Sequence, residues 1–284
     1  MGNARKLREL LGREEIVVAA GAYDGLSALL VKEAGFDAVF CTGGGISRSF
    51  GYADVGYLTL TELVDRVANM VEVTGLPCIV DADSGFGNAL NIQRTVRLLE
   101  RAGAAGIHIE DEEFPARGRG LADRYYSTDE MVRRLEAMVA ARRDPDLVLI
   151  ARTSVLPGLG LDEAIARANR YAQTGVDMVY VEYAATPADV EEVARRVAAP
   201  KLIGQNKDEV AVRKPAELQA LGFRMLTYPA DSQLAAIHAM RGVLNHLREH
   251  GTSLGYTDMV TFEERDRAIG ADRHKSVLRT YLPE

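Results

Sequence analysis

The strongest structural signal in this chain is the stretch Ile79-Val80-Asp81-Ala82-Asp83-Ser84-Gly85-Phe86-Gly87-Asn88. An apolar run ends in two carboxylates one residue apart, a glycine-flanked turn follows, and Asn88 opens an amphipathic segment. This order predicts a buried strand that carries charge to its own C-terminal end. Asp81 and Asp83 are expected to point to the same side of that strand. Two like charges placed so close together require a cation or a shared proton.

Oxygen ligands beside a glycine-containing turn favour a hard divalent cation. Asp81 and Asp83 are therefore predicted to bind Mg²⁺, for which Mn²⁺ could substitute. The alternative is that both aspartates only cap a helix or form a turn, as Asp commonly does. The rest of the chain has to decide between these two interpretations.

The order of strand, loop and helix recurs along the whole chain. Each predicted strand is a short apolar run, and these runs cover residues 16–20, 38–41, a segment around 80, 106–109, 147–151, 178–181, 201–204 and 224–228. Eight such units predict an α/β fold, a parallel (β/α)₈ barrel of the TIM type, in which the loops after the strands lie on one face and carry the site. We expect residues 1–250 to form this catalytic barrel and residues 251–284 a helical extension for oligomer packing.

The C-terminal extension contains a predicted charged helix over residues 262–281. A closed barrel does not need this helix, and the helix cannot bury itself on its own barrel. It is therefore predicted to pack on a partner subunit, in a homo-oligomer that is a dimer or a tetramer.

Composition excludes several classes of partner. The net charge of −7 argues against nucleic acid, which requires clustered Lys and Arg. No apolar run approaches about 20 residues, so no membrane contact is expected, and the N-terminus lacks the apolar segment of a secretory signal. The two cysteines, Cys41 and Cys78, lie in apolar strand-like runs and are expected to be buried free thiols. A cytoplasmic location follows as the expectation.

Charged residues stand at the predicted C-terminal ends of several strands, where a barrel would bring them together: Asp81, Asp83, Glu110, Arg152 and Glu182. Carboxylates with one arginine predict a site that holds Mg²⁺ and grips an anionic group of a small substrate. The alternative for Arg152 is a salt bridge that only neutralises its neighbours. The alternative for Glu182 is a bond to neighbouring backbone or to a basic group.

Other segments contribute to the same predicted face. The turn Thr42-Gly43-Gly44-Gly45 exposes backbone N–H groups to an anion, and residues 46–57 are expected to be a long loop. The Arg-rich segment 112–126 has no hydrophobic period and is predicted to be a lid in which Arg117 contacts substrate. The alternative is that its arginines only form a solvated face. His108 is predicted to be a hydrogen-bonded core residue, because it lies in mid-strand among apolar neighbours.

These motifs resemble those of the isocitrate lyase/phosphoenolpyruvate mutase superfamily over nearly the whole chain. The motifs occur in family order: AYDGLSA at 22–28, the Gly-rich turn at 42–45, DADSGFGN at 81–88, IED at 109–111, ARTS at 151–154 and GLDEAI at 160–165. The resemblance implies a barrel with a terminal helix swapped between subunits, a Mg²⁺ ion, and a small anionic 2-oxo or 2-hydroxy acid as substrate. Superfamily members make or break C–C or P–C bonds beside a pyruvate-like unit, through an enolate.

The resemblance also implies roles for single residues. Asp81 and Asp83 match the metal carboxylates, and Glu110 matches an acidic partner that acts through metal-bound water. Arg152 matches the residue that grips the substrate carboxylate, which Thr42, Gly43 and Gly44 also contact. The expected catalytic residues are Asp54, Arg152, Tyr23 and Glu110, and the expected substrate-binding residues are Thr42, Gly43, Gly44, Arg152, Glu182 and Arg117.

The segment 114–120 departs from both branches of the superfamily. It lacks the cysteine that the lyase branch uses as general acid, and it has Ala116 and Gly118 where the phosphonopyruvate branch has lysine and asparagine. The shared enolate-stabilising core would still suffice to decarboxylate a 2-oxo diacid, because the departing CO₂ needs no general acid. The first interpretation is a Mg²⁺-dependent lyase that cleaves a C–C bond by retro-aldol reaction or decarboxylation. The alternatives are a phosphonopyruvate mutase or hydrolase, and a catalytically inactive binding paralogue.

Overall fold

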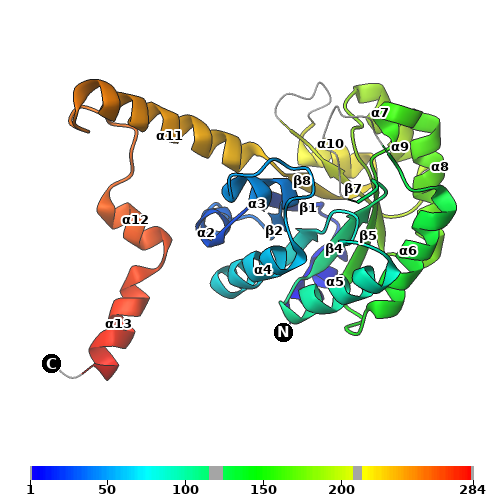
Figure 1. Cartoon of the computed structure of the whole chain (residues 1–284), viewed down its shortest axis with the longest axis horizontal. Helices are drawn as coiled ribbons and strands as arrows, with labels where there is room; N and C mark the ends of the chain where they lie inside the picture. The colour runs from blue at the N-terminus through cyan, green and yellow to red at the C-terminus, as the bar shows by residue number, and fades with distance from the viewer. Residues whose placement is uncertain (1, 115–123, 207–212, 283–284) are drawn as a thin grey trace.

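The computed structural model describes residues 2–114, 124–206 and 213–282, and its centre is a closed barrel of parallel strands (Figure 1). Each strand pairs with the next one in sequence, and β8 closes the barrel against β1. The strands are β1 (Val17–Ala22), β2 (Ala38–Cys41), β3 (Cys78–Asp81), β4 (Gly106–Glu110), β5 (Val148–Thr153), β6 (Met178–Val181), β7 (Lys201–Gly204) and β8 (Phe223–Tyr228). The predicted (β/α)₈ fold is confirmed.

Most of the helices follow a strand and surround the barrel, whereas the first precedes β1 and the last three continue beyond β8. The helices are α1 (Asn3–Leu11), α2 (Gly25–Glu33), α3 (Gly43–Ser49), α4 (Leu60–Thr74), α5 (Ala89–Arg101), α6 (Thr128–Ala141), α7 (Leu156–Leu159), α8 (Leu161–Tyr171) with the 3₁₀ turn η1 (Ala172–Thr174), α9 (Pro187–Arg196), α10 (Pro215–Ala220), α11 (Asp231–His250), α12 (Phe262–Ala268) and α13 (Ala271–Tyr281). Several begin with reciprocal capping boxes, such as Thr59 with Glu62 and Asn88 with Asn91. These caps satisfy N–H groups that a helix start otherwise leaves without acceptors.

The barrel has an apolar interior and a separate apolar layer beneath the helices. In β5, Val148 and Ile150 belong to the buried cluster inside the barrel, whereas Leu149 and Ala151 belong to the cluster under the helices. This alternation is the period-two pattern of a strand that is buried on both faces. Leu7 of α1 joins the interior cluster. The polar side chains that could bind a ligand lie instead at the C-terminal ends of the strands.

Two local expectations are wrong. Residues 43–49 form helix α3, where a long loop was expected to begin; the Thr42 hydroxyl accepts the Gly45 N–H at 3.2 Å and starts the helix in spite of its glycines. The C-terminal extension is two helices, because Gly270 adopts a left-handed conformation (φ 65°) between α12 and α13. Glycine tolerates that conformation without steric penalty.

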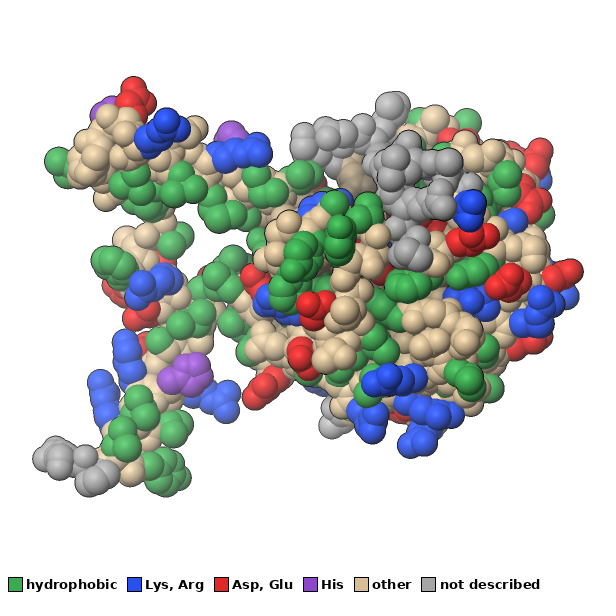
Figure 2. Space-filling view, in the orientation of Figure 1, with side chains coloured by type: hydrophobic (Ala, Val, Ile, Leu, Met, Phe, Trp, Pro, Cys, Tyr) green, Lys and Arg blue, Asp and Glu red, His purple; other side chains and the backbone are tan. Residues whose placement is uncertain are grey.

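Helix α11 extends away from the barrel, and α12 and α13 follow its outer end, with α12 in contact with α2 (Figure 1). No residue of α11, α12 or α13 is buried, and large apolar side chains remain exposed, including Leu244 (61%) and Phe262 (80%). Figure 2 shows such apolar side chains along these three helices. Within the described part of the chain, no helix combines the length and apolar character that crossing a membrane requires.

Candidate active site

The strand register brings charged side chains to one end of the barrel. Glu110 of β4 pairs with Arg152 of β5, and Arg152 pairs in turn with Tyr180 of β6. Asp81 ends β3, beside β4. All four residues line a cavity of about 220 Å³ at the strand C-termini. The predicted convergence of charge at this face therefore appears in the structure.

Asp81 and Asp83 approach each other over the first glycine of α3. A Cβ atom at Gly43 would lie 3.3 Å from Asp81 Oδ2 and 3.4 Å from Asp83 Oδ1, so both carboxylates crowd one point. A side chain at Gly44 would collide with the carboxylate of Asp54. Asp83 reaches this position from a turn with φ 45°, beyond the end of β3, and not from the strand as expected. Glycines in α3 are thus what allows the acidic groups to gather.

The carboxylate oxygens gathered here are ligands that suit a hard divalent cation. Within the described ranges, no group of three or more His, Cys, Asp or Glu side chains is arranged to hold a metal ion by itself. Mg²⁺ commonly keeps several waters and takes only one or two carboxylates from the protein. The pair Asp81 and Asp83 satisfies that requirement, with Asp54 and Glu110 at the wall of the same cavity.

Arg152 ties the acidic side chains together. Its Nη2 lies 2.8 Å from Glu110 Oε2 and also donates to Glu182, while Nη1 lies 3.7 Å from Asp81 Oδ2. The Ser154 hydroxyl donates to Glu182 Oε2 at 3.0 Å and to Glu110 Oε2 at 3.3 Å. The Arg152 side chain is 12% exposed. One buried cation therefore partly compensates three carboxylates and leaves the site acidic.

The pKa values of Asp83 and Glu110 are raised, so both carboxylates resist ionisation. Burial raises the pKa of Asp83 well above its usual value, and the charges of Asp81 and Asp54 raise it further. Burial also raises the pKa of Glu110, although Arg152 lowers it in part. For Arg152, burial by itself lowers the pKa, but the neighbouring carboxylates outweigh burial and raise it. A bound divalent cation would supply the positive charge that the site lacks.

A pH dependence of stability follows for the metal-free protein. Because Asp83 and Glu110 have folded-state pKa values above the unfolded value of about 4, the folded state retains protons that the unfolded state releases. Their contribution to stability is complete below the unfolded pKa and is lost as the pH rises through the raised pKa. We expect the Tm in EDTA to fall from pH 5 to pH 8, and less steeply in Asp83→Asn. A Tm that rises over this interval would contradict the prediction.

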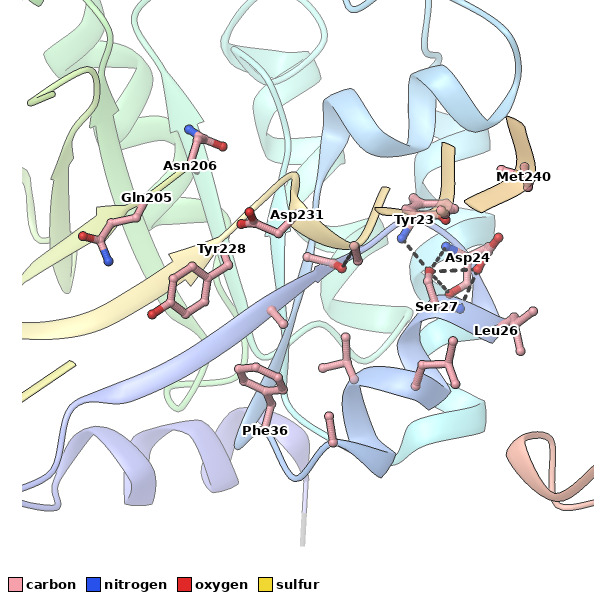
Figure 3. A pocket seen from close by; sticks show the side chains of 17 residues that line it. Tyr23, Asp24, Leu26, Ser27, Phe36, Gln205, Asn206, Tyr228, Asp231 and Met240 are labelled. Carbon is pink, nitrogen blue, oxygen red and sulfur yellow. Dashed lines mark hydrogen bonds between the residues drawn. The ribbon is translucent and has the colours of Figure 1, made fainter. Parts of the chain in front are cut away.

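The structure locates most of the site residues predicted from sequence. The 220 Å³ cavity is lined by Thr42, Gly44, Asp54, Asp81, Asp83, Glu110, Arg152 and Glu182, and Gly43 borders the aspartate pair. Tyr23 instead lines a neighbouring, mostly apolar cavity of about 990 Å³ between α2 and α11. Figure 3 shows it there beside Asp24 and Ser27. Arg117 and most of the predicted lid lie outside the described residues.

His108 is fully buried below the site, as predicted, but the expected hydrogen bond is absent. Its ring stacks on Phe40 with centroids 5.6 Å apart, and Nδ1 lies 3.7 Å from Asp81 Oδ1. In the described part of the chain, neither ring nitrogen has a hydrogen-bond partner. Burial lowers the pKa of His108 to about 4, so the ring is neutral at physiological pH.

A second buried network was not predicted from sequence. The Asp111 carboxylate accepts the Thr153 hydroxyl at 2.7 Å, the Ser154 N–H at 2.9 Å and the Tyr171 hydroxyl at 2.9 Å. Arg167 Nη1 pairs with the same carboxylate at 3.2 Å. This network fixes the segment that carries Ser154, which in turn contacts Glu110 and Glu182. The only sequence signal for it was the acidic residue next to Glu110.

The sequence of this chain matches one protein-family model and several curated enzymes. Residues 7–248 match the family model described as phosphoenolpyruvate phosphomutase. The chain is 40% identical to 2,3-dimethylmalate lyase of Eubacterium barkeri, with 99% of each chain covered. It is 36% identical to 2-methylisocitrate lyase of Aeropyrum pernix, with 96% of this chain and 93% of the relative covered.

Two solved structures have the same fold as this chain. Oxaloacetate acetylhydrolase, in complex with the inhibitor 3,3-difluorooxalacetate, superposes with a TM-score of 0.93 at 30% identity, covering 100% of this chain and 98% of the other. Phosphonopyruvate hydrolase, in complex with oxalate and Mg²⁺, superposes with a TM-score of 0.90 at 27% identity, covering 100% of both chains. The chain therefore belongs to the phosphoenolpyruvate mutase/isocitrate lyase superfamily. Its similarity to two named lyases makes it a carbon–carbon lyase of that superfamily.

Proposed function

We propose that this lyase depends on a divalent cation and cleaves a C–C bond of a small 2-oxo or 2-hydroxy carboxylate. The observation that supports the proposal most directly is the meeting of Asp81 and Asp83 over Gly43, beside the buried Arg152. The cavity of about 220 Å³ suits a small acid. Mg²⁺ is the proposed ion, since phosphonopyruvate hydrolase of the same fold has been solved with oxalate and Mg²⁺.

In this proposal Asp81 and Asp83 would hold the cation, and Glu110 would act on it through water. The bound cation would stabilise the negative charge that develops on the substrate oxygen as an enolate forms. Arg152 supplies N–H donors for a substrate carboxylate. The N–H groups of Gly43 and Gly44 lie in the first turn of α3, where a helix provides no acceptor of its own, and they are proposed to contact the same carboxylate.

A substrate panel tests the proposed reaction. The purified chain is incubated with 2,3-dimethylmalate, 2-methylisocitrate, oxaloacetate or phosphonopyruvate, in Mg²⁺, Mn²⁺ or EDTA, and products are quantified by mass spectrometry. We expect C–C cleavage of at least one carboxylate, lost in EDTA and restored by Mg²⁺. Turnover of phosphonopyruvate alone would replace this proposal with a P–C bond reaction. Binding of oxalate without turnover of any diacid would favour a binding protein.

We also propose that the C-terminal arm joins subunits, in a cytoplasmic dimer or tetramer. The arm is α11 together with the proposed extension 251–284, and it leaves apolar side chains such as Met240 exposed (53%). The cavity of about 990 Å³ beside α2 is also mostly apolar (Figure 3). An arm with exposed apolar side chains and an apolar cavity on the same chain suit exchange between copies.

Disruption of the arm should therefore change the assembly state. We expect light scattering to give a multiple of the 30.9 kDa chain mass, and Met240→Glu combined with Leu244→Glu to shift the protein towards monomer, because charges would be buried without partners. Asn245→Glu serves as the matched control, because it places the same charge at an exposed position of the same helix that is polar in the native chain. A wild-type protein that elutes as a monomer would contradict the proposal.

A further inference from the structure

The turn that carries Asp83 has an unusual backbone. In the described chain, three non-glycine residues have positive φ: Asp83 (45°), Phe86 (60°) and Tyr183 (63°). Two of them lie in the turn 83–87, between β3 and α5, and the third follows β6 on the wall of the same cavity. L-amino acids rarely adopt this conformation unless the surrounding structure enforces it. Contacts from outside the turn must therefore hold Asp83 in place.

Those contacts reach four carbonyl groups of the turn. The Asp83 carbonyl accepts the Glu110 N–H at 2.9 Å, and the Gly85 carbonyl accepts the Thr95 hydroxyl at 3.1 Å. The Ser84 and Gly87 carbonyls both accept hydrogen bonds from Arg134 Nη2, each at 2.7 Å. One guanidinium nitrogen thus binds the turn at two points, Ser84 and Gly87.

Burial of the Arg134 side chain costs desolvation free energy. Arg134 projects from α6, is 6% exposed, and lies with its guanidinium carbon 3.9 Å from the ring centroid of Tyr126. Among the described residues it forms no salt bridge with a carboxylate, and its Nε has no hydrogen-bond partner. Its partners at hydrogen-bond or ring-contact distance are carbonyls and a ring, and the charge of Glu130 compensates it only from farther away. An apolar side chain would fill the space without desolvating a charge.

Tyr126, whose ring contacts Arg134, is hydrogen-bonded to the residue that follows β4. The Tyr126 N–H donates to the Asp111 carbonyl at 2.9 Å, and the Tyr126 carbonyl accepts from Arg167 Nη1 at 2.8 Å. The guanidinium of Arg134 is therefore sandwiched between the turn 83–87 and a residue anchored beside Glu110. Its own position is fixed from both sides, which a residue that positions another requires.

We propose that Arg134 is a positioning residue for the candidate metal site: by holding the Ser84 and Gly87 carbonyls it keeps the turn in its left-handed conformation and the Asp83 carboxylate directed at Asp81. This inference rests on the proposed function, because the ion is the proposed Mg²⁺. It assigns Arg134 no contact with substrate or metal.

Three variants of the full-length protein test the proposal. Arg134→Met keeps the length and removes both hydrogen bonds, Arg134→Lys keeps the charge and one donor group, and Arg133→Met is the matched control, because Arg133 is the exposed neighbour on α6. The measurements are Mg²⁺ and Mn²⁺ affinity by calorimetry, hydrogen–deuterium exchange of the segment 83–88 in the metal-free protein, and kcat as a function of Mg²⁺ concentration.

For Arg134→Met we expect metal affinity to fall about 10- to 100-fold, as for other groups that orient metal ligands. Exchange of the segment 83–88 should accelerate, and saturating Mg²⁺ should restore most of kcat. Arg134→Lys should lie between Arg134→Met and wild type, and it replaces the methionine variant if that variant does not fold. Arg133→Met should match wild type in every measurement.

Two results separate failure of this inference from failure of the proposed function. If wild type binds Mg²⁺ and Arg134→Met binds it equally well with unchanged exchange of 83–88, Arg134 is only a packing residue and the inference is overturned. If wild type binds neither Mg²⁺ nor Mn²⁺, the metal-dependent function fails. Faster exchange of 83–88 in Arg134→Met than in Arg133→Met would then still support the positioning of the turn, and equal exchange would overturn it.

Discussion

Asp83→Ala is expected to abolish metal-dependent turnover, with kcat/KM lowered about a thousand-fold or more. A metal that polarises a substrate oxygen contributes several kcal/mol to transition-state stabilisation, and about 1.4 kcal/mol corresponds to a factor of ten in rate. Asp83 is one of the two carboxylates that meet over Gly43, so its loss leaves Asp81 as the single direct carboxylate of the pair.

The fold should survive this substitution. The carboxylate of Asp83 is destabilising in the metal-free protein, because burial and two neighbouring aspartates raise its pKa. We therefore expect the Tm of Asp83→Ala in EDTA to equal or exceed that of wild type. Added Mg²⁺ should raise the Tm of wild type and not that of the variant.

Asp65→Ala is the matched control, because Asp65 is an exposed aspartate on α4. The control should keep both activity and the Mg²⁺-dependent rise in Tm. Wild-type activity in Asp83→Ala would refute the metal assignment. A variant that loses activity only because it unfolds would instead show a lower Tm in EDTA than wild type.

The barrel and the charged strand ends were predictable because both are local patterns. Each apolar run followed by an amphipathic segment identifies one β/α unit, and repetition of that unit defines the fold. Asp81, Glu110 and Arg152 end or nearly end their strands, so the fold alone brings them to one face. No knowledge of side-chain packing was required for that step.

The conformations at two glycine-rich points were not predictable from local preference. Three consecutive glycines disfavour a helix by about 1 kcal/mol each relative to alanine, yet α3 begins at Gly43. Burial of residues 43–47 and the cap from Thr42 outweigh that cost. Asp83 was expected to continue a strand, whereas Gly85 and Gly87 allow the turn to carry it in a left-handed conformation.

Contacts that helix residues make across long sequence separations were missed altogether. Arg134 of α6 bonds to a carbonyl 50 residues earlier in the chain, and Arg167 of α8 bonds to a carbonyl 41 residues earlier. Neither pair has a spacing that a strand or a helix would impose. Contacts of this kind are set by the packing of helices on the barrel, which a single sequence does not specify.

Substitution of Arg152 should have the second large effect, on stability as well as activity. Arg152→Met leaves Glu110, Glu182 and Asp81 without their shared cation, and removing one partner of a buried ion pair costs about 3–5 kcal/mol. Arg152→Lys keeps the charge but loses the planar fork that can contact a substrate carboxylate and Glu182 at once. We expect the lysine variant to remain folded and to lose at least about a hundred-fold in kcat/KM, mostly through KM.

The double variant Arg152→Met with Glu182→Gln separates a substrate contact from a structural salt bridge. Neutralising Glu182 removes one of the buried charges that Arg152→Met leaves unpaired, so part of the lost Tm should return. If Arg152 were only a salt bridge, activity would recover together with stability. If Arg152 grips the substrate carboxylate, activity stays at the level of Arg152→Met while the Tm rises, and oxalate binding measured by calorimetry stays weak. Recovery of both quantities in the double variant would assign Arg152 to the architecture of the site and leave the substrate carboxylate to the N–H groups at the start of α3.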